Sequence, residues 1–432
     1  MTSLPKNIDD WLRWQRGLNP QLIELGLDRL RPVAQRMNLL SAADAVPVIT
    51  VAGTNGKGST IALLEALSHC HGLRCASYTS PWLLRCNESV RIDAQAVSDE
   101  TLMAAFERVE KARQGVPLTE FEFRTLAAVD IAFAYQPDVV LLEVGLGGRL
   151  DAVNLFDATV AIISSIALDH QRWLGDTREQ IAIEKIGVAR RDAVLVSAES
   201  SSHELLEPLA RAVGAVPLLA QRDFHFGARS EEPECWWYRG DAIDFKSLPM
   251  PALPGRHQLA NAAAAIAALS SLGIAQLDCS RTSLALREVT LSGRLQRLVG
   301  APVRFVDVAH NPHAAAALAH WARAHAPWPI TALCAMYGDK DLSGTVQALY
   351  GIVQSWHLAP LPPPRGASAQ ALADAVRQAD SHVPITVHAS ISQAWQSTVR
   401  QADQGGCALA FGSFETVGEV LRLESSATKL DT

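Results

Sequence analysis

The sequence predicts an α/β protein of two domains, each built on a mostly parallel sheet wrapped by helices. Its 432 residues exceed one ordinary core, because domains average roughly 100–200 residues. Short β-branched runs alternate with helical patterns, which is typical of parallel sheets. A second series of this kind begins after Leu291. We therefore expect a first domain at 1–291 and a smaller α/β domain at 292–432.

In the first domain, each expected strand ends at glycines or at polar residues that could form a site. The earliest strand is a β-branched run that ends at Gly53 and precedes a helix. A proline-containing stretch at 229–254 resembles a small antiparallel insertion. The expected strands are 47–52, 138–144 and 159–164, and the expected helices are 61–71, 99–113, 123–135, 178–189 and 258–272.

The second domain repeats the alternation. We expect strands at 303–308, 330–336 and 407–411, with an alanine-rich helix that begins at Pro312. This pattern favours a second parallel sheet.

Charge and cysteine content exclude several classes of protein. There are 38 basic and 45 acidic residues, a formal charge of −7, so no basic excess is available to neutralise nucleic acid. The seven cysteines include no C-x-x-C pair, which fits a reducing compartment better than a disulfide framework or a zinc site. No run approaches the ~18 apolar residues of a membrane span. We expect a cytoplasmic monomer without nucleic-acid or membrane partners.

The strongest local signal is G-T-N-G-K-G-S at 53–59, which joins a buried strand to a helix. Backbone N–H groups and the positive helix end can cradle phosphates there. Lys57 would neutralise phosphate charge, and Ser59 could place its hydroxyl on Mg²⁺. The spacing departs from G-x-x-x-x-G-K-[ST], since Gly58 separates Lys57 from Ser59 and Val51 stands at the first glycine position. The alternative is an ordinary glycine turn.

This loop resembles the phosphate loop of the Mur ligase superfamily, which includes cell-wall Mur ligases, cyanophycin synthetase and the folylpolyglutamate synthases. Other segments resemble the folate branch in the same order, over nearly the whole chain. They are T-S-P-W-L-L-R at 79–85, N-E-S-V-R-I at 87–92, F-E-F-R-T at 121–125, E-V-G-L-G-G-R-L-D-A-V-N at 143–154, L-D-H at 168–170, E-K-I-G at 184–187, S-G-R at 292–294, D-V-A-H-N-P at 307–312, D-K-D at 339–341 and G-S-F-E-T-V-G-E-V at 412–420.

The resemblance implies a Mur-ligase-like P-loop ATPase domain followed by a smaller, Rossmann-like C-terminal domain. It also implies an ATP-dependent ligase that joins L-glutamate to dihydropteroate, forming dihydrofolate, and to tetrahydrofolate, extending a polyglutamate chain. In the implied mechanism the acceptor carboxylate attacks the γ-phosphate of ATP and forms an acyl phosphate. The amino group of glutamate then displaces phosphate.

The resemblance further implies two magnesium ions. Glu143 ends a buried strand and would share one ion with Ser59, because hard cations require oxygen ligands. His170 would bind the second ion with Lys185, which the family pattern makes a carbamate; Lys57, Lys185 and His170 are the expected catalytic residues. A lone histidine is more often structural, and a lone lysine is usually a solvated charge.

Nucleotide and acceptor sites follow from the same resemblance. The phosphate-loop residues Asn55, Gly56, Lys57, Gly58 and Ser59, with Asn261, Arg294, Asp307 and His310, are expected to bind ATP between the two domains. An aspartate that ends a strand, such as Asp307, could instead be a helix cap. The resemblance places the pterin acceptor against Asp28, Arg29, Ser80, Pro81, Phe121, Glu122, Leu150, Asp151 and Ala152.

Three rival interpretations are weaker. The glycines at 145–148 lack the G-x-G-x-x-G spacing of a dinucleotide site. Only 52 residues precede Gly53, too few for the nucleotide-sugar domain of a cell-wall Mur ligase. A nucleotide-dependent switch would not require the second-domain motifs. Trp82, Ser89 and Tyr337-Gly338 depart from the family pattern and leave the preferred acceptor open.

Overall fold

The computed structural model describes residues 4–428, which divide into two compact units. Unit 1 is Met1–Ala167, Gln171–Ala252 and Gln258–Thr290, and unit 2 is Leu168–His170, Leu253–His257 and Leu291–Thr432. Two short segments that precede Leu291 thus belong to the same unit as the last third of the chain.

Unit 1 is built on an eight-stranded sheet in the order β4-β3-β2-β5-β1-β6-β7-β8. The pairings from β2 to β8 are parallel, whereas β3 and β4 pair antiparallel at one edge. The expected mostly parallel sheet is confirmed. Its strands are β1 Val48–Ala52, β2 Cys75–Tyr78, β3 Val90–Ile92, β4 Gln95–Ala96, β5 Val139–Glu143, β6 Val160–Ile163, β7 Val194–Ser197 and β8 Val216–Leu219.

Strand β1 lies at the centre of this sheet because every side chain of its V-I-T-V-A run is buried. Val51 pairs with Glu143 of β5 on one side and with Ile162 of β6 on the other. The chain adds β2 and β5 on the first side and β6, β7 and β8 on the second, so the strand order reverses at β1. Ligands bind outside the carboxyl ends of parallel strands at such a switch point.

The helices of unit 1 begin at recognisable caps. Ser98 caps α5, Thr119 and Glu122 form a capping box on α6, and Thr177 caps α8. The helices are α1 Ile8–Arg16, α2 Leu30–Arg36, α3 Leu39–Ala43, α4 Lys57–Cys70, α5 Asp99–Arg113, α6 Glu120–Ala134, α7 Gln171–Leu174, α8 Arg178–Ile186, α9 His203–Val213, α10 His257–Ser271 and α11 Cys279–Glu288, with short 3₁₀ turns η1 Cys86–Ser89, η2 Ala152–Leu155 and η3 Ser200–Ser202.

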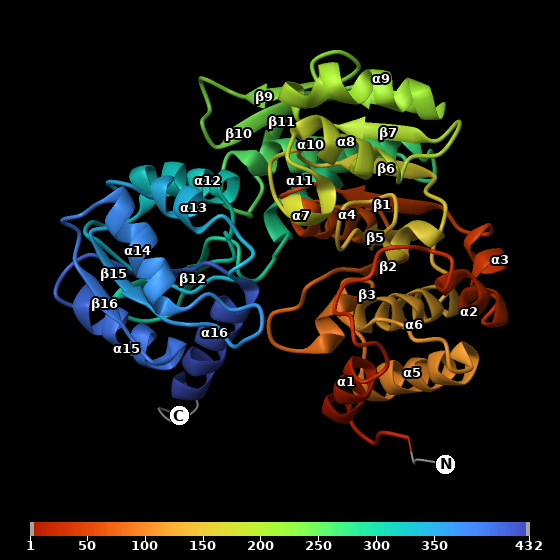
Figure 1. Cartoon of the computed structure of the whole chain (residues 1–432). Helices are drawn as coiled ribbons and strands as arrows, with labels where there is room; N and C mark the ends of the chain where they lie inside the picture. The colour runs from red at the N-terminus through yellow and green to blue at the C-terminus, as the bar shows by residue number, and fades with distance from the viewer. Residues whose placement is uncertain (1–3, 429–432) are drawn as a thin grey trace. The chain divides into compact units, whose positions relative to one another are not determined.

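The proposed insertion is confirmed as a three-stranded antiparallel sheet (Figure 1). Its strands are β9 His225–Ala228, β10 Cys235–Arg239 and β11 Asp244–Pro249, so it begins slightly earlier than expected. Trp236 and Tyr238 of β10 are buried, which gives this small sheet an aromatic core.

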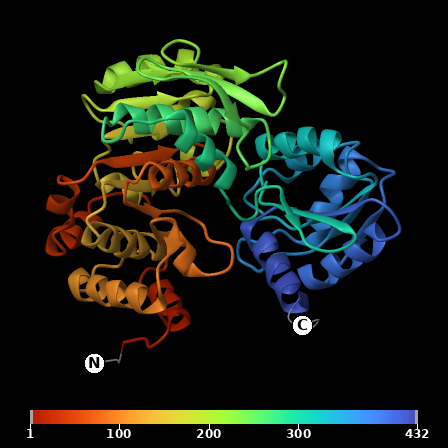
Figure 2. The same ribbon diagram turned by 180° about the vertical axis from the view of Figure 1, so that it is seen from behind.

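Unit 2 has a six-stranded sheet in the order β12-β13-β17-β14-β15-β16, parallel except for the β12–β13 pair. Helices α12 to α14 lie on one side of it and α15 and α16 on the other (Figures 1 and 2). The elements are β12 Gln296–Leu298, β13 Val303–Asp307, α12 Pro312–His325, β14 Ile330–Cys334, α13 Leu342–Gln347, β15 Ser355–Leu358, α14 Ala369–Ala379, β16 Ile385–Val387, α15 Ile391–Ala402, β17 Cys407–Phe411 and α16 Phe414–Thr428.

The carboxyl ends of β13, β17 and β14 are adjacent, because Phe411 pairs with Asp307 on one side and Cys334 on the other. The loops that follow these strands therefore meet at one edge of the sheet.

Within residues 4–428, no helix is both long and apolar enough to cross a membrane.

Candidate functional site

The glycines of the phosphate loop are required by close backbone approach. Gly53 and Gly56 have φ values of +153° and +90°, which other residues rarely adopt. A Cβ atom on Gly53 would lie 1.9 Å from Ser164 Oγ, and one on Gly56 would lie 2.8 Å from Asn261 Oδ1. The loop is therefore pressed against two other segments of unit 1 and is more than an ordinary turn.

The loop after β6 holds the phosphate loop in shape. Thr54 N donates to Ser165 O at 2.8 Å, and Asn55 N donates to Ser165 Oγ at 2.9 Å. Ser164 Oγ donates in turn to Asn55 O at 2.7 Å. Sequence reasoning missed both serines, although their position directly after a strand of the switch point is a signal that could have identified them.

Lys57 is the first residue of α4, which begins inside the loop and four residues earlier than expected. Its ammonium donates to Gly53 O at 3.1 Å and to Thr54 O at 3.4 Å. The ammonium therefore lies against the backbone of the loop that would cradle a phosphate group.

Helix α10 reaches the same loop. Gln258 Nε2 donates to Ser59 Oγ at 3.4 Å, and Asn261 Nδ2 donates to Gln258 Oε1 at 2.8 Å. Asn261 was expected at the nucleotide and lies against Gly56. Gln258 was not expected, but it stands three residues before Asn261 and hence on the same helix face.

Glu143 is a buried carboxylate at the end of β5, with 5% of its surface exposed. It accepts a hydrogen bond from Ser80 N at 3.1 Å, because Ser80 follows the neighbouring strand β2. An expected metal ligand and an expected acceptor residue thus lie together at the carboxyl edge of the sheet.

Asp151 organises the loop that follows β5. Its carboxylate accepts from Leu146 N at 2.8 Å and from Val153 N at 3.1 Å. Burial raises the pKa of Asp151 to about 7, although the backbone donors and Lys57 favour the ionised form. Ala152, the first residue of η2, is buried beside it.

Aromatic residues line the same region of unit 1. A Cβ atom on Gly145 would lie 2.5 Å from Phe121 Cζ, and the Phe121 ring centroid is 6.1 Å from that of Tyr78. The Arg124 guanidinium lies 4.5 Å from the centroid of the Trp82 ring, and Pro81 beside it is exposed.

Arg29 and Glu122 have contacts that stabilise the fold. Glu122 accepts from Thr119 N at 2.8 Å as part of the capping box, and its other oxygen pairs with Arg29 at 2.7 Å. Gly26 N donates to Leu150 O at 3.1 Å, so the segment that carries Asp28 and Arg29 is tied to the Asp151 loop. Asp28 itself is exposed.

Lys185 is buried, with 2% of its surface exposed, so the alternative of a solvated surface charge is wrong. The end of α8 packs against the glycine cluster after β5. Arg149 N donates to Glu184 O at 2.8 Å, and a Cβ atom on Gly148 would lie 2.9 Å from Lys185 O. These glycines therefore serve helix packing, which agrees with rejecting a dinucleotide site.

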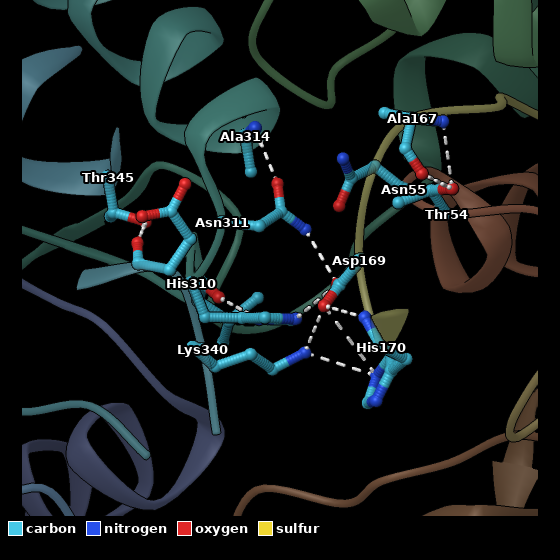
Figure 3. A network of polar contacts seen from close by, with 12 residues as sticks. Thr54, Asn55, Ala167, Asp169, His170, His310, Asn311, Ala314, Lys340 and Thr345 are labelled. Atoms are coloured by element: carbon cyan, nitrogen blue, oxygen red, sulfur yellow. Dashed lines mark hydrogen bonds and ion pairs between the residues drawn. The ribbon is translucent and has the colours of Figure 1, made fainter. Parts of the chain in front are cut away.

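In unit 2, Asp169 is the centre of a polar cluster drawn in Figure 3. Asn311 Nδ2 donates to it at 3.0 Å, His310 Nε2 lies at 3.6 Å, and Lys340 Nζ lies at 2.7 Å. Burial alone would raise the pKa of Asp169, but the His310 hydrogen bond and the Lys340 ammonium hold it well below its usual range. His170, next in the chain, has a left-handed backbone with φ +52°.

Asp307 and Arg294 are also part of unit 2. Asp307 accepts from Leu295 N and from Ala309 N, both at 2.8 Å. Burial raises the pKa of Asp307 against the opposing effect of Arg294, whose guanidinium lies 5.0 Å from the Phe414 ring centroid. The alternative of a helix cap is wrong, because Asn311 caps α12.

The expected site residues thus form two groups. Unit 1 contains the phosphate loop, the acceptor set, Glu143, Lys185 and Asn261. Unit 2 contains His170, Arg294, Asp307 and His310. Within residues 4–428, no group of three or more His, Cys, Asp or Glu side chains could hold a metal ion.

Known proteins resemble this chain along almost its full length. The Mur ligase, glutamate ligase domain model matches residues 293–414. The dihydrofolate synthase/folylpolyglutamate synthase of Escherichia coli (strain K12) is 37% identical over 416 residues, which cover 96% of this chain and 94% of that protein.

Solved structures agree with this likeness. E. coli FolC in complex with DHPP and ADP has a TM-score of 0.90 at 34% identity, covering 98% of this chain and 99% of that chain. A bifunctional folylpolyglutamate synthase/dihydrofolate synthase with Mn, AMPPNP and L-glutamate bound has a TM-score of 0.85 at 38% identity, covering 97% and 98%. With this fold, this phosphate loop and this extent of identity, the chain belongs to the dihydrofolate synthase/folylpolyglutamate synthase family of Mur ligases.

Proposed function

We infer that this protein is an ATP-dependent ligase of folate biosynthesis, which joins L-glutamate to dihydropteroate and to tetrahydrofolate. The observation that carries this inference is the glycine loop that follows β1, at the switch point of the sheet. The chain is also 37% identical, over 96% of its length, to a dihydrofolate synthase/folylpolyglutamate synthase. The loop supplies backbone amides and the Lys57 ammonium, the groups that transfer of a phosphoryl group requires.

We propose that phosphoryl transfer takes place at this loop. A carboxylate oxygen of the acceptor attacks the γ-phosphorus of ATP, ADP leaves, and an acyl phosphate forms. Lys57 and the loop amides stabilise the charge on the transferring group. Asn261 approaches the loop from α10, Arg294 and His310 contribute charge and hydrogen bonds to the nucleotide, and Asp307 accepts from the ribose hydroxyls.

The second step forms the amide. The unprotonated amino group of glutamate attacks the acyl carbon, and the tetrahedral adduct collapses with loss of inorganic phosphate. Exclusion of water protects the acyl phosphate from hydrolysis. The protein forms no covalent bond to either substrate.

We propose that the acceptor lies along the region between Phe121 and Asp151. The Phe121 ring offers a flat apolar face to a pterin, and Asp151 offers a hydrogen-bonding carboxyl group. Ser80, Pro81, Leu150 and Ala152 border this region, while Arg29 and Glu122 stabilise it through their ion pair. Asp28 is exposed and would contact the acceptor only at its edge.

The residues present fit magnesium. Glu143 is a buried carboxylate at the sheet edge, and a cation, the Lys340 ammonium, lies 3.1 Å from His170 Nε2. We propose that Glu143 and Ser59 hold one ion and that His170 and a carbamylated Lys185 hold a second. When bound, these ions neutralise phosphate charge and polarise the γ-phosphoryl group.

We propose that the enzyme acts as a cytoplasmic monomer with small-molecule partners. All seven cysteines are free, and a reducing compartment keeps thiols in that state. The net charge of −7 gives no basis for nucleic-acid binding.

The test is a direct assay of amide formation. Purified protein receives ATP, Mg²⁺ and labelled glutamate, with dihydropteroate and tetrahydrofolate offered separately. We expect label in dihydrofolate in the first case and in a polyglutamate in the second, with one ADP released per amide bond. Nucleotide binding without amide formation from either acceptor would favour the switch instead.

A further inference from the structure

Lys340 is the central residue of the D-K-D motif and has no role in the proposed chemistry above. It lies in the loop between β14 and α13, and its side chain is 4% exposed. Its ammonium lies 2.7 Å from Asp169 Oδ1 and 3.1 Å from His170 Nε2 (Figure 3). Buried lysines are rare unless they are paired. The two partners of this buried ammonium are themselves side chains that could bind a metal ion.

The surroundings of Asp169 explain why a cation is held there. The carboxylate is 8% exposed, and removing a charge from water is costly unless it is paired. Asn311 Nδ2 donates to Asp169 at 3.0 Å and His310 Nε2 lies at 3.6 Å, but neither is a permanent cation. The Lys340 ammonium supplies the full positive charge.

The contact with His170 has a second consequence. An ammonium has only hydrogens to donate, so His170 Nε2 must contribute its lone pair to Lys340. A divalent cation bound at Nε2 would need the same lone pair. The ammonium and the metal ion therefore cannot both use this atom.

We propose that Lys340 is a built-in competitor for the divalent cation at His170. When the metal ion binds Nε2, Lys340 gives up that contact and retains its ion pair with Asp169. The competition weakens binding of the divalent cation at His170. This inference rests on the proposed role of His170 as a metal ligand.

The test measures Mn²⁺ affinity by the paramagnetic resonance signal of free Mn²⁺, in full-length protein saturated with AMPPNP. Of the two proposed metal sites, the one at His170 is expected to bind Mn²⁺ more weakly. We expect Lys340→Met to bind Mn²⁺ at this site about tenfold more tightly than wild type, since the charge-assisted hydrogen bond from Lys340 no longer competes with the metal ion for His170 Nε2. A residue that merely orients a ligating histidine has the opposite signature, because its loss weakens metal binding about 10–100-fold. Unchanged or weaker binding would overturn the proposal.

Three further variants complete the test. Lys340→Gln can still donate to Asp169 and should also tighten Mn²⁺ binding, which serves if Lys340→Met does not fold. Arg365→Met is the control, because Arg365 pairs with Asp339 of the same D-K-D motif. It also removes one positive charge and should leave the Mn²⁺ affinity unchanged.

His170→Ala separates the two levels of the argument. It should abolish the weaker Mn²⁺ site. If both sites persist in His170→Ala, the metal assignment and this inference fall together, whereas loss of one site without tighter binding in the Lys340 variants overturns this inference alone.

Discussion

The Lys57 side chain of the phosphate loop already lies where a nucleotide phosphate is expected to bind. In the structure the Lys57 ammonium donates to two neutral carbonyl groups, those of Gly53 and Thr54. Phosphate oxygens are charged acceptors and bind an ammonium about twice as strongly as neutral ones. When nucleotide binds, the Lys57 ammonium should therefore donate to its phosphate oxygens in place of these carbonyl groups.

Lys57→Ala should lower kcat by about 10²–10³ or more, because it removes a charge that stabilises the transition state. The fold should persist, since the Lys57 ammonium donates to Gly53 O and Thr54 O of its own loop. Steady-state ATP hydrolysis coupled to amide formation measures the effect. Lys246→Ala, which removes a lysine with 80% side-chain exposure, is the control and should retain wild-type turnover. Normal turnover in a folded Lys57→Ala variant would remove the loop from the mechanism.

A second residue-scale feature concerns stability. Gln15 of α1 is fully buried, and within residues 4–428 neither of its amide atoms has a hydrogen-bond partner. Trp11, one turn earlier, packs against Phe106 and Phe123. A buried amide without partners costs about 1–3 kcal/mol.

Gln15→Leu should therefore stabilise unit 1 by about 1–2 kcal/mol, because leucine occupies a similar volume without a desolvation cost. Thermal unfolding followed by calorimetry would report this as a higher midpoint for the transition of unit 1. A lower midpoint would show that ordered water satisfies the amide in solution.

At the scale of elements, α8 presents Lys185 to the interior of unit 1. A buried ammonium would require an anionic partner, whereas a carbamate is itself an oxygen donor for a metal ion. The helix end is fixed by the Arg149–Glu184 pair at 2.8 Å. The position of Lys185 is therefore set by the fold before any modification.

Lys185→Ala should lose activity and regain part of it when a short carboxylic acid supplies the missing oxygens. Lys185→Arg should show no rescue, since its guanidinium fills the space with positive charge. Intact mass of the bicarbonate-equilibrated wild type should show one added carboxylate. An unmodified, fully active enzyme would contradict the carbamate.

The pairing of β15 with β16 places two imidazoles in contact. His357 Nδ1 lies 2.8 Å from His388 Nε2, and His357 Nε2 lies 2.9 Å from Gln401 Oε1. Burial is the largest cause of the lowered pKa of both histidines, and Arg400 lowers both further. The folded state therefore favours neutral imidazole rings. The contribution of the pair to folding stability is fully present above the pKa of histidine in the unfolded chain, and it is lost as pH falls below about 6.5.

Unit 2 should consequently lose thermal stability between pH 7.5 and pH 5.5. The loss should be smaller in His388→Gln, which can still donate to His357 but cannot become charged. His382→Gln alters an exposed histidine of the same unit and should behave as wild type. An equal loss in all three proteins would exclude the pair as the cause.

At the scale of the whole molecule, expected ATP-site residues come from both units. The segments Leu168–His170 and Leu253–His257 belong to unit 2 although they precede its main part. Cutting the chain at the expected boundary would thus divide unit 2, and point variants are the better probe of its contribution.

Arg294→Ala and Asp307→Ala should each raise the KM for ATP and lower kcat together, because both residues are expected to act on bound nucleotide. Binding of the pterin acceptor, measured by fluorescence titration, should be unchanged. Arg297→Ala removes an exposed arginine of β12 and should have no effect. Wild-type ATP kinetics in both site variants would leave unit 2 without a nucleotide-binding role.

The sequence by itself determined the central strands β1, β5, β6, β13, β14 and β17, the first residues of α5, α8 and α12, the phosphate loop and the family. These features depend on local patterns, such as the short, continuously apolar runs that are typical of strands buried on both faces of a parallel sheet. Strands β2, β7 and β8 of unit 1 escaped prediction, as did the short strands β3, β4, β12, β15 and β16, because none has a distinct periodicity.

The tertiary structure alone decided which side chains meet. Gln258 reaches Ser59 across 199 positions of sequence, and Lys340 reaches Asp169 across 171. The burial of Lys185 and the membership of Leu168–His170 in unit 2 are of the same kind. The physical reason is that local propensity acts over one or two turns of chain, whereas these contacts exist only once folding has brought segments far apart in the sequence together.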